Sequence, residues 1–369
     1  MERLSEVRTK HDRVRKFLKE KGYAGVLLSS IANFSWLTGG ADTHVEIHNK
    51  YGVGSLFVTD KRIYVITNNI EAERLGTEEL KGVESEFEFA VSNWYDPSGE
   101  SKILKKLTTG SAIGADSARE GMSLLGGDFA SLRYELTDAE IERFRWLGKH
   151  SSMAVEAAGR ELRPGMTEHE IEAAMAQKLM ADNMMPVVLL VSADKRNFMY
   201  RHPTPTENKF TEYVQLVCCA RRWGLITSRT RSVHLGKAPE DLKKKQEAVA
   251  YIDAVFMART KPGVVVGKIL DDAKAAYAKV GFPDEWQFHH QGGSIGYEAR
   301  DYIGISESTD VVVNHQGFAW NPTIQGAKSE DTIIVSSGEP ELITLTNDWP
   351  VIDVEVDGMT FSRPAIMEL

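Results

Sequence analysis

The sequence predicts an α/β protein with two domains, a smaller α/β domain over residues 1–133 and an α+β domain over residues 134–369. Three observations predict this class. The chain of 369 residues is longer than the roughly 250–300 residues at which a single core stops growing. Predicted strands alternate with helices in the first third. A unit of helix, basic residue, Pro-Gly, helix and strand occurs twice afterwards, which predicts two pseudo-symmetric halves and one curved antiparallel sheet.

The N-terminal domain is expected to alternate helices and strands. Leu4, Val7, Val14 and Phe17 recur at helical spacing, and Gly22 ends that helix. Further elements follow from apolar runs and turn residues: a buried strand over 24–29, a hairpin of 55–59 with 63–67, a helix over 101–107 and a short strand over 111–115. The glycine-rich tract 120–133 shows no clear period and is expected to be a linker.

The repeated unit organises the C-terminal domain. Thr137 and Thr167 each precede a Glu by three residues, as in a capping box, and begin helices expected over 141–162 and 167–183. Arg163-Pro164-Gly165 separates that helix pair, and Lys261-Pro262-Gly263 separates a second pair over 241–259 and 266–281. The alternative to a true internal repeat is that common helix-breaking residues recur at these two places by coincidence.

Composition narrows the class of partner. The net charge is −9 and the pI is about 5.7, which excludes nucleic acid or an anionic membrane as the main partner. The longest apolar runs, such as 186–191, are far too short for a membrane span, and the N-terminus has no apolar signal region. We therefore expect a cytoplasmic protein that acts on a small-molecule substrate.

The only cysteines, Cys218 and Cys219, are adjacent. Neighbouring side chains on a strand point to opposite faces and rarely bridge. We expect two buried thiols; the alternatives are that one occupies a former ligand position or acts as a nucleophile.

Several segments resemble one known family along almost the whole chain. The segments that carry the resemblance are 32–39, 162–171, 201–204, 228–230 and 329–332. They resemble the pita-bread family of creatinase, aminopeptidase P, prolidase and methionine aminopeptidase. The resemblance implies a creatinase-type N-terminal domain, a catalytic pita-bread domain and a homodimer, in which the loop 39–44 contacts the partner.

The resemblance also implies where metal ligands would stand, namely two Asp, one His and two Glu. The first Asp falls within 215–220, which contains no acid, and the second falls on Ile226. The His falls on Gly293 and the first Glu on Asn321, so that only Glu330 remains. Because a two-metal site needs several carboxylates, we expect no metal and no cofactor. A remodelled single-metal site is the alternative.

The remaining polar residues suggest a metal-free site. His202 is the acid–base candidate, since histidine titrates near neutrality, and Glu330 is a candidate to activate water. His289 and His290 complete the catalytic candidates; if they alternate on a strand, only one points into the pocket. Four further residues are candidates for substrate binding: Arg300, Asp301, Arg229 and Asn321. For Arg229 the alternative is a structural role, and for Arg300 with Asp301 a structural ion pair. For Glu330 the alternative is that it is a buried partner of Lys328 or Arg229.

Three functions follow from this reading. The first is a metal-independent, creatinase-like hydrolase of a C–N bond in a small amide, amidine or guanidine. The second is an Xaa-Pro dipeptidase or aminopeptidase with an atypical metal site. The third is a ligand-binding protein without catalysis. Sensitivity to chelators separates the second from the others, and turnover separates the first from the third.

Overall fold

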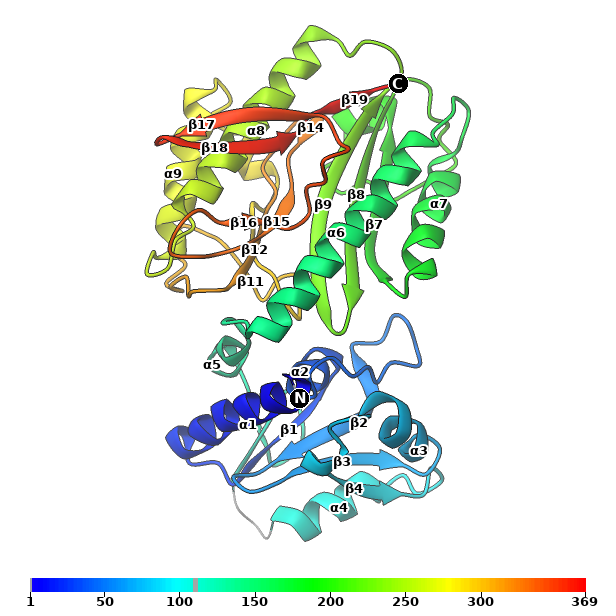
Figure 1. Ribbon diagram of the computed structural model, residues 1–369, viewed down its shortest axis with the longest axis vertical. Coiled ribbons are helices and arrows are strands. Elements are labelled where there is room, and N and C mark those ends of the chain that lie inside the picture. Colours follow the sequence, from blue (N-terminus) through cyan, green and yellow to red (C-terminus); the bar gives the residue numbers. More distant parts are fainter. Residues whose placement is uncertain (1, 109–111) are drawn as a thin grey trace. The chain divides into compact units, whose positions relative to one another are not determined.

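The computed structural model describes residues 2–108 and 112–369, which form two compact units (Figure 1). The first unit contains the chain up to Arg133 together with Thr137–Glu140. The second contains Tyr134–Leu136 and Ile141–Leu369. No helix among the described residues is long and apolar enough to cross a membrane.

A six-stranded mixed sheet forms the centre of the first unit, in the order β4-β3-β2-β1-β5-β6. Its strands are β1 (Gly25–Ser30), β2 (Tyr51–Val58), β3 (Ile63–Asn68), β4 (Phe87–Ser92), β5 (Ile113–Ala115) and β6 (Ser123–Leu124). The expected hairpin is present as the antiparallel pair β2 and β3, whereas β5 runs parallel to β1. Of the strand expected over 111–115, residue 111 lies outside the described residues.

Helices accompany this sheet, and two of them, α1 and α4, were expected from the sequence. They are α1 (Glu2–Lys21), α2 (Ile31–Leu37), α3 (Ala72–Arg74), α4 (Gly99–Thr108) and α5 (Gly127–Ala130). Helix α1 buries Val7, Val14 and Phe17 and ends at Gly22, whose φ of 70° suits a residue without a side chain. The tract 120–133 is not a plain linker as expected, because its residues form β6, α5 and a 3-10 turn (Ser131–Arg133).

The first half of the second unit is a four-stranded sheet with a helix pair (Figure 1). Its strands are β7 (Met185–Ala193), β8 (Tyr213–Arg222), β9 (Leu225–His234) and the C-terminal β19 (Ile366–Glu368). The helices are α6 (Asp138–Arg160) and α7 (Glu168–Ala181), and α7 begins with the predicted capping box of Thr167 and Glu170. Ser151 on α6 hydrogen bonds to Thr227 on β9, so α6 packs on this sheet.

The second half repeats this plan with α8 (Glu240–Arg259) and α9 (Val266–Lys279). Its five-stranded sheet has the order β11-β10-β12-β15-β16. The strands are β10 (Gly292–Ser294), β11 (Tyr302–Ile303), β12 (Gly317–Trp320), β15 (Asp331–Ile334) and β16 (Glu341–Leu342). Two hairpins complete the unit, β13 (Thr323–Ile324) with β14 (Ala327–Lys328), and β17 (Val351–Val356) with β18 (Met359–Pro364). The helix pair and the sheet share one apolar core that includes Phe256 and Trp320.

The two sheets of the second unit meet at β9 and β15. Thr230 on β9 donates its backbone N–H to the carbonyl of Glu330, which directly precedes β15, over 3.0 Å. Ser228 donates its backbone N–H to Thr332 Oγ1, and the Thr332 hydroxyl donates to the backbone carbonyl of Ser228. This seam places β8 and β9 from one half beside Lys328 and Glu330 from the other.

Candidate active site

A cavity of about 300 Å³ lies at this seam within the second unit. It is bounded by residues of both halves of the repeat. They are Val188, Leu190, His202, Thr204, Val217, Cys219, His290, Ala299, Arg300, Asn321, Lys328 and Glu330. The lining therefore combines apolar side chains, such as Val188, Leu190 and Val217, with charged and imidazole side chains.

Glu330 is 1% exposed and uses both carboxylate oxygens for protein contacts. Its Oε1 accepts from Ser228 Oγ at 2.6 Å and from Arg300 Nη2 at 3.1 Å. Its Oε2 accepts from Thr230 Oγ1 at 2.8 Å and from Lys328 Nζ at 2.9 Å. Four donors on one carboxylate leave it little capacity to accept a further proton or ligand.

The ionisation of Glu330 follows from these contacts. Burial alone would raise its pKa, but Lys328, Arg300 and the hydroxyl of Ser228 together lower the pKa far below the usual range of a glutamate. Glu330 is therefore a permanent counterion for the two cations. It is a poor general base, because a base must take up a proton near the working pH.

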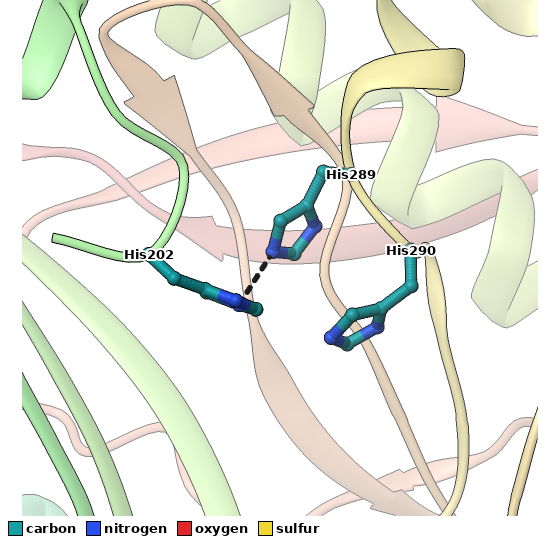
Figure 2. A group of neighbouring side chains, drawn as sticks. All are labelled: His202, His289 and His290. Carbon is teal, nitrogen blue, oxygen red and sulfur yellow. Dashed lines mark hydrogen bonds between the residues drawn. The ribbon is translucent and has the colours of Figure 1, made fainter.

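Three histidines meet beside this ion cluster (Figure 2). His202 Nε2 lies 2.8 Å from His289 Nε2, and Figure 2 marks this hydrogen bond. The rings of His289 and His290 stack, with centroids 4.5 Å apart and planes at 22°. The expectation that these neighbours face opposite ways is wrong, because they lie between the 3-10 helix Glu285–Phe288 and β10 rather than on a strand.

All three imidazoles are neutral at neutral pH. Burial, with help from the charge of Lys328, lowers the pKa of His289 to about 2. Burial and the charge of Arg300 lower the pKa of His290 to about 4. Burial also lowers the pKa of His202, and the charge of Lys328 adds to the effect. Of the three rings, His202 is the most exposed and therefore the best placed to accept a proton.

The hydrogen bonds constrain which nitrogens carry protons. A neutral imidazole has one N–H and one lone pair, so in the His202–His289 pair one ring donates and the other accepts. His290 Nδ1 accepts the backbone N–H of Gly292 at 3.2 Å, which assigns its proton to Nε2. His290 therefore offers a donor through Nε2.

The family resemblance implies a two-metal site, but the side chains around Glu330 do not supply the ligands that a pair of metal ions needs. A pair of divalent cations needs several free carboxylate oxygens, and both oxygens of Glu330 are engaged by cations and hydroxyls. One nitrogen from each of the three histidines lies within 4.8 Å of the others, which resembles a single-metal site. However, metal-bound histidines usually donate their second N–H to an acceptor, and His290 Nδ1 faces a donor instead. The residues do not fit the two-metal group.

The structure brings most predicted site residues together. His202, His290, Arg300, Asn321 and Glu330 line the cavity, and His289 contacts His202.

Two of the predicted site residues are placed differently. Arg229 is fully buried and does not line the cavity; its guanidinium donates to Thr227 Oγ1 at 2.6 Å and to Cys218 Sγ at 3.6 Å. Asp301 is also outside the lining, and its backbone N–H donates to Ser294.

Other residues of the site were not predicted to line it, although a buried pairing of Glu330 with Lys328 was one alternative and is present. Lys328 lies two residues before Glu330, and this spacing places side chains on one face of an extended segment, so it could have been found. Ser228 and Thr230, rather than Ile226, contact Glu330. Cys219 lines the cavity with its Sγ 3.2 Å from Ser228 Oγ, and burial raises the pKa of its thiol, which does not favour a nucleophile.

Comparison with known families identifies the class of this fold. The model of metallopeptidase family M24 matches residues 142–337, which is more than half of the chain. The chain therefore belongs to metallopeptidase family M24, and the predicted pita-bread resemblance is confirmed. A comparison with curated proteins gave no match.

Solved structures show the same fold over nearly the whole chain. An Xaa-Pro dipeptidase from Bacillus anthracis matches with a TM-score of 0.78 and 19% identity, covering 98% of this chain and 100% of that one. Dipeptidase PepE from Mycobacterium ulcerans matches with a TM-score of 0.77 and 16% identity, covering 99% and 98%. The N-terminal domain of FACT complex subunit SPT16 from Cicer arietinum matches with a TM-score of 0.70 and 14% identity, covering 92% and 96%. Family membership and these folds support a hydrolase fold of the Xaa-Pro peptidase type.

Proposed function

We propose that the protein is a hydrolase that cleaves a C–N bond of a small molecule without a two-metal cluster. One observation carries this proposal: Lys328 and Arg300 occupy the oxygens of Glu330, beside a neutral His202–His289 pair. The positive charge that metal ions supply in a metallohydrolase is supplied here by side chains.

The reaction that suits this arrangement is water attack on a carbonyl carbon. His202 accepts a proton from the water while the water oxygen forms a bond to the carbonyl carbon. The carbonyl oxygen takes up the electron pair and becomes an oxyanion. When the C–N bond breaks, the nitrogen leaves with the proton returned by His202, and the products are an amine and an acid.

The cavity holds donors that would stabilise the oxyanion. Lys328 Nζ and His290 Nε2–H belong to cavity-lining residues, and charged or fixed donors aimed at a developing oxyanion lower the barrier. Glu330 holds Lys328 and Arg300 in place rather than taking part in proton transfer. His289 orients the ring of His202, since their nitrogens are 2.8 Å apart.

Turnover of a substrate panel tests this function. The panel contains small amides, ureas, guanidines and Xaa-Pro dipeptides, each assayed before and after removal of metal with a chelator. We expect turnover that survives the chelator and falls by about 10²–10⁴ in kcat in His202→Ala. The matched control is His169→Ala on the exposed surface of α7, which should retain full activity. Chelator-sensitive turnover that added metal restores would contradict the proposal.

Ligand binding without catalysis is the second candidate. One of the similar structures is a domain of a complex subunit, so the fold is not confined to peptidases. For this candidate, the panel would show binding at the cavity without product formation, and His202→Ala would leave the affinity unchanged.

A further inference from the structure

The charges around the cavity are not balanced. Lys328 and Arg300 are positive, Glu330 is negative, and the lining imidazoles of His202 and His290 are neutral at neutral pH because burial lowers their pKa. The lining groups therefore carry one excess positive charge. Such a site attracts an anion and repels a cation, more strongly in a partly buried cavity than in water.

Two lining residues also hold buried polar atoms that have no partner in the described part of the chain. They are Arg300 Nε, which is a donor, and Asn321 Oδ1, which is an acceptor. Asn321 is only 2% exposed. Buried polar atoms are nearly always hydrogen bonded in folded proteins, so such atoms at a cavity point to a ligand or solvent molecule that completes them. The complementary ligand supplies an acceptor to Arg300 and an N–H donor to Asn321.

We propose that the substrate is a small carboxylate with an uncharged amide or urea C–N bond, whose carboxylate is bound by Arg300 and whose N–H is bound by Asn321. This inference rests on the proposed function and names the substrate of the same site. Val188, Leu190 and Val217 are the apolar lining residues against which a short carbon chain packs. The cavity of about 300 Å³ suits a molecule of this size.

The same argument disfavours amidines and guanidines. A guanidinium group would enter beside Lys328 and Arg300, and the one carboxylate that could pair with it, Glu330, already accepts four hydrogen bonds. Like charges without a free counterion raise the cost of binding. Of the three C–N bonds expected from the sequence, the neutral one fits the cavity.

Three matched probes test the inference by calorimetric binding to the full chain. N-carbamoylglycine has the neutral urea and the carboxylate. Guanidinoacetate replaces the urea oxygen by a charged nitrogen, and N-carbamoylglycinamide removes the carboxylate charge. We expect N-carbamoylglycine to bind at least about tenfold more tightly than either of the others, which corresponds to about 1.4 kcal/mol. Equal or tighter binding of guanidinoacetate, or no binding of N-carbamoylglycine, overturns the inference.

A variant pair assigns the carboxylate contact. Arg300→Gln should lose at least about tenfold in affinity for N-carbamoylglycine but not for N-carbamoylglycinamide. Lys244→Gln, on the exposed surface of α8, removes the same charge elsewhere and should bind as the wild type does. Equal loss of affinity for both probes in Arg300→Gln contradicts the assignment, and its thermal unfolding curve shows whether the variant is folded.

Binding and turnover separate the two proposals. N-carbamoylglycine that binds selectively without being hydrolysed supports the substrate's charge pattern and counts against hydrolysis. Metal-free turnover of guanidinoacetate in preference to N-carbamoylglycine supports hydrolysis and overturns the charge pattern.

Discussion

Lys328 and Glu330 form a buried ion pair of 2.9 Å between residues two positions apart, with side chains 4% and 2% exposed. Glu330 is the one acid that the sequence offers at the ligand positions expected from the family resemblance, and Lys328 pairs with it. The pair couples the fold to the site, because Lys328 ends β14 and Glu330 precedes β15.

Loss of Lys328 should be costly. Lys328→Met keeps most of the side-chain volume but removes one of the two cations paired with Glu330, and we expect the free energy of unfolding to fall by about 3 kcal/mol. Lys178→Met breaks a surface pair with Glu161 of 2.8 Å and should cost no more than about 1 kcal/mol. Urea denaturation measures both. A similar decrease in the free energy of unfolding in the two variants would mean that the buried Lys328–Glu330 pair contributes no more to stability than a surface pair does.

Acid should destabilise the protein through His289. The pKa of His289 is lowered from 6.5 to about 2 in the folded protein, so the unfolded chain binds the proton more tightly. The stability from this group is full above pH 6.5 and is lost as the pH falls through the range between the two values.

At pH 5, which is 1.5 units below 6.5, the loss is about 2 kcal/mol at about 1.4 kcal/mol per unit. Chemical denaturation at pH 7 and pH 5 should show this loss in the wild type and a smaller loss in His289→Gln. If the stability of both proteins depended on pH in the same way, protonation of His289 would not be the cause of the loss at pH 5.

Two glycines with nearly the same backbone conformation should respond differently to alanine. Gly165 has φ of 89° and open space around an added Cβ, whereas Gly292 has φ of 90° and would place a Cβ 2.2 Å from the carbonyl oxygen of Ala319. Gly165→Ala should cost about 1 kcal/mol from backbone strain alone.

Gly292→Ala should cost about 2 kcal/mol more, because β10 must move away from β12. Thermal unfolding compares the two variants. An equal loss of stability in the two variants would show that β10 can move away from β12 without a cost in free energy.

Metal content distinguishes the three-histidine cluster from a metal site. After mild dialysis without chelator, elemental mass spectrometry should find well below one transition-metal ion per chain, because His290 Nδ1 faces a donor and Lys328 with Arg300 repel cations. His290→Ala should leave the metal content unchanged. One tightly held ion per chain that is lost in His290→Ala would instead establish a metal site at His202, His289 and His290.

Much of the fold was predictable because local signals agree with tertiary packing. The capping box of Thr167 and Glu170, the breaks at Gly165 and Gly263, and the apolar face of α9 all lie where the pattern predicts. The tract 120–133 was mispredicted, since β6 has only two residues and is held by pairing with β5 rather than by its own sequence.

The site was predictable in its residue types more than in its geometry. His202, Arg300, Asn321 and Glu330 were expected and line one cavity. The stacking of His289 on His290 was not, because it depends on the chain leaving strand geometry before β10, which no periodicity records. Arg229 differs from Ser228 by one position on β9 and therefore faces the other side of the sheet, which a one-residue uncertainty in register conceals.

Lys328 also limits what a substitution elsewhere in the site can achieve. An acidic side chain introduced at Ile226 or Asn321, two of the expected ligand positions, would still leave the ammonium group of Lys328 on Glu330, so a divalent cation would be repelled until Lys328 itself changed. Lys328 is therefore the position whose side chain decides whether Glu330 is open to a cation.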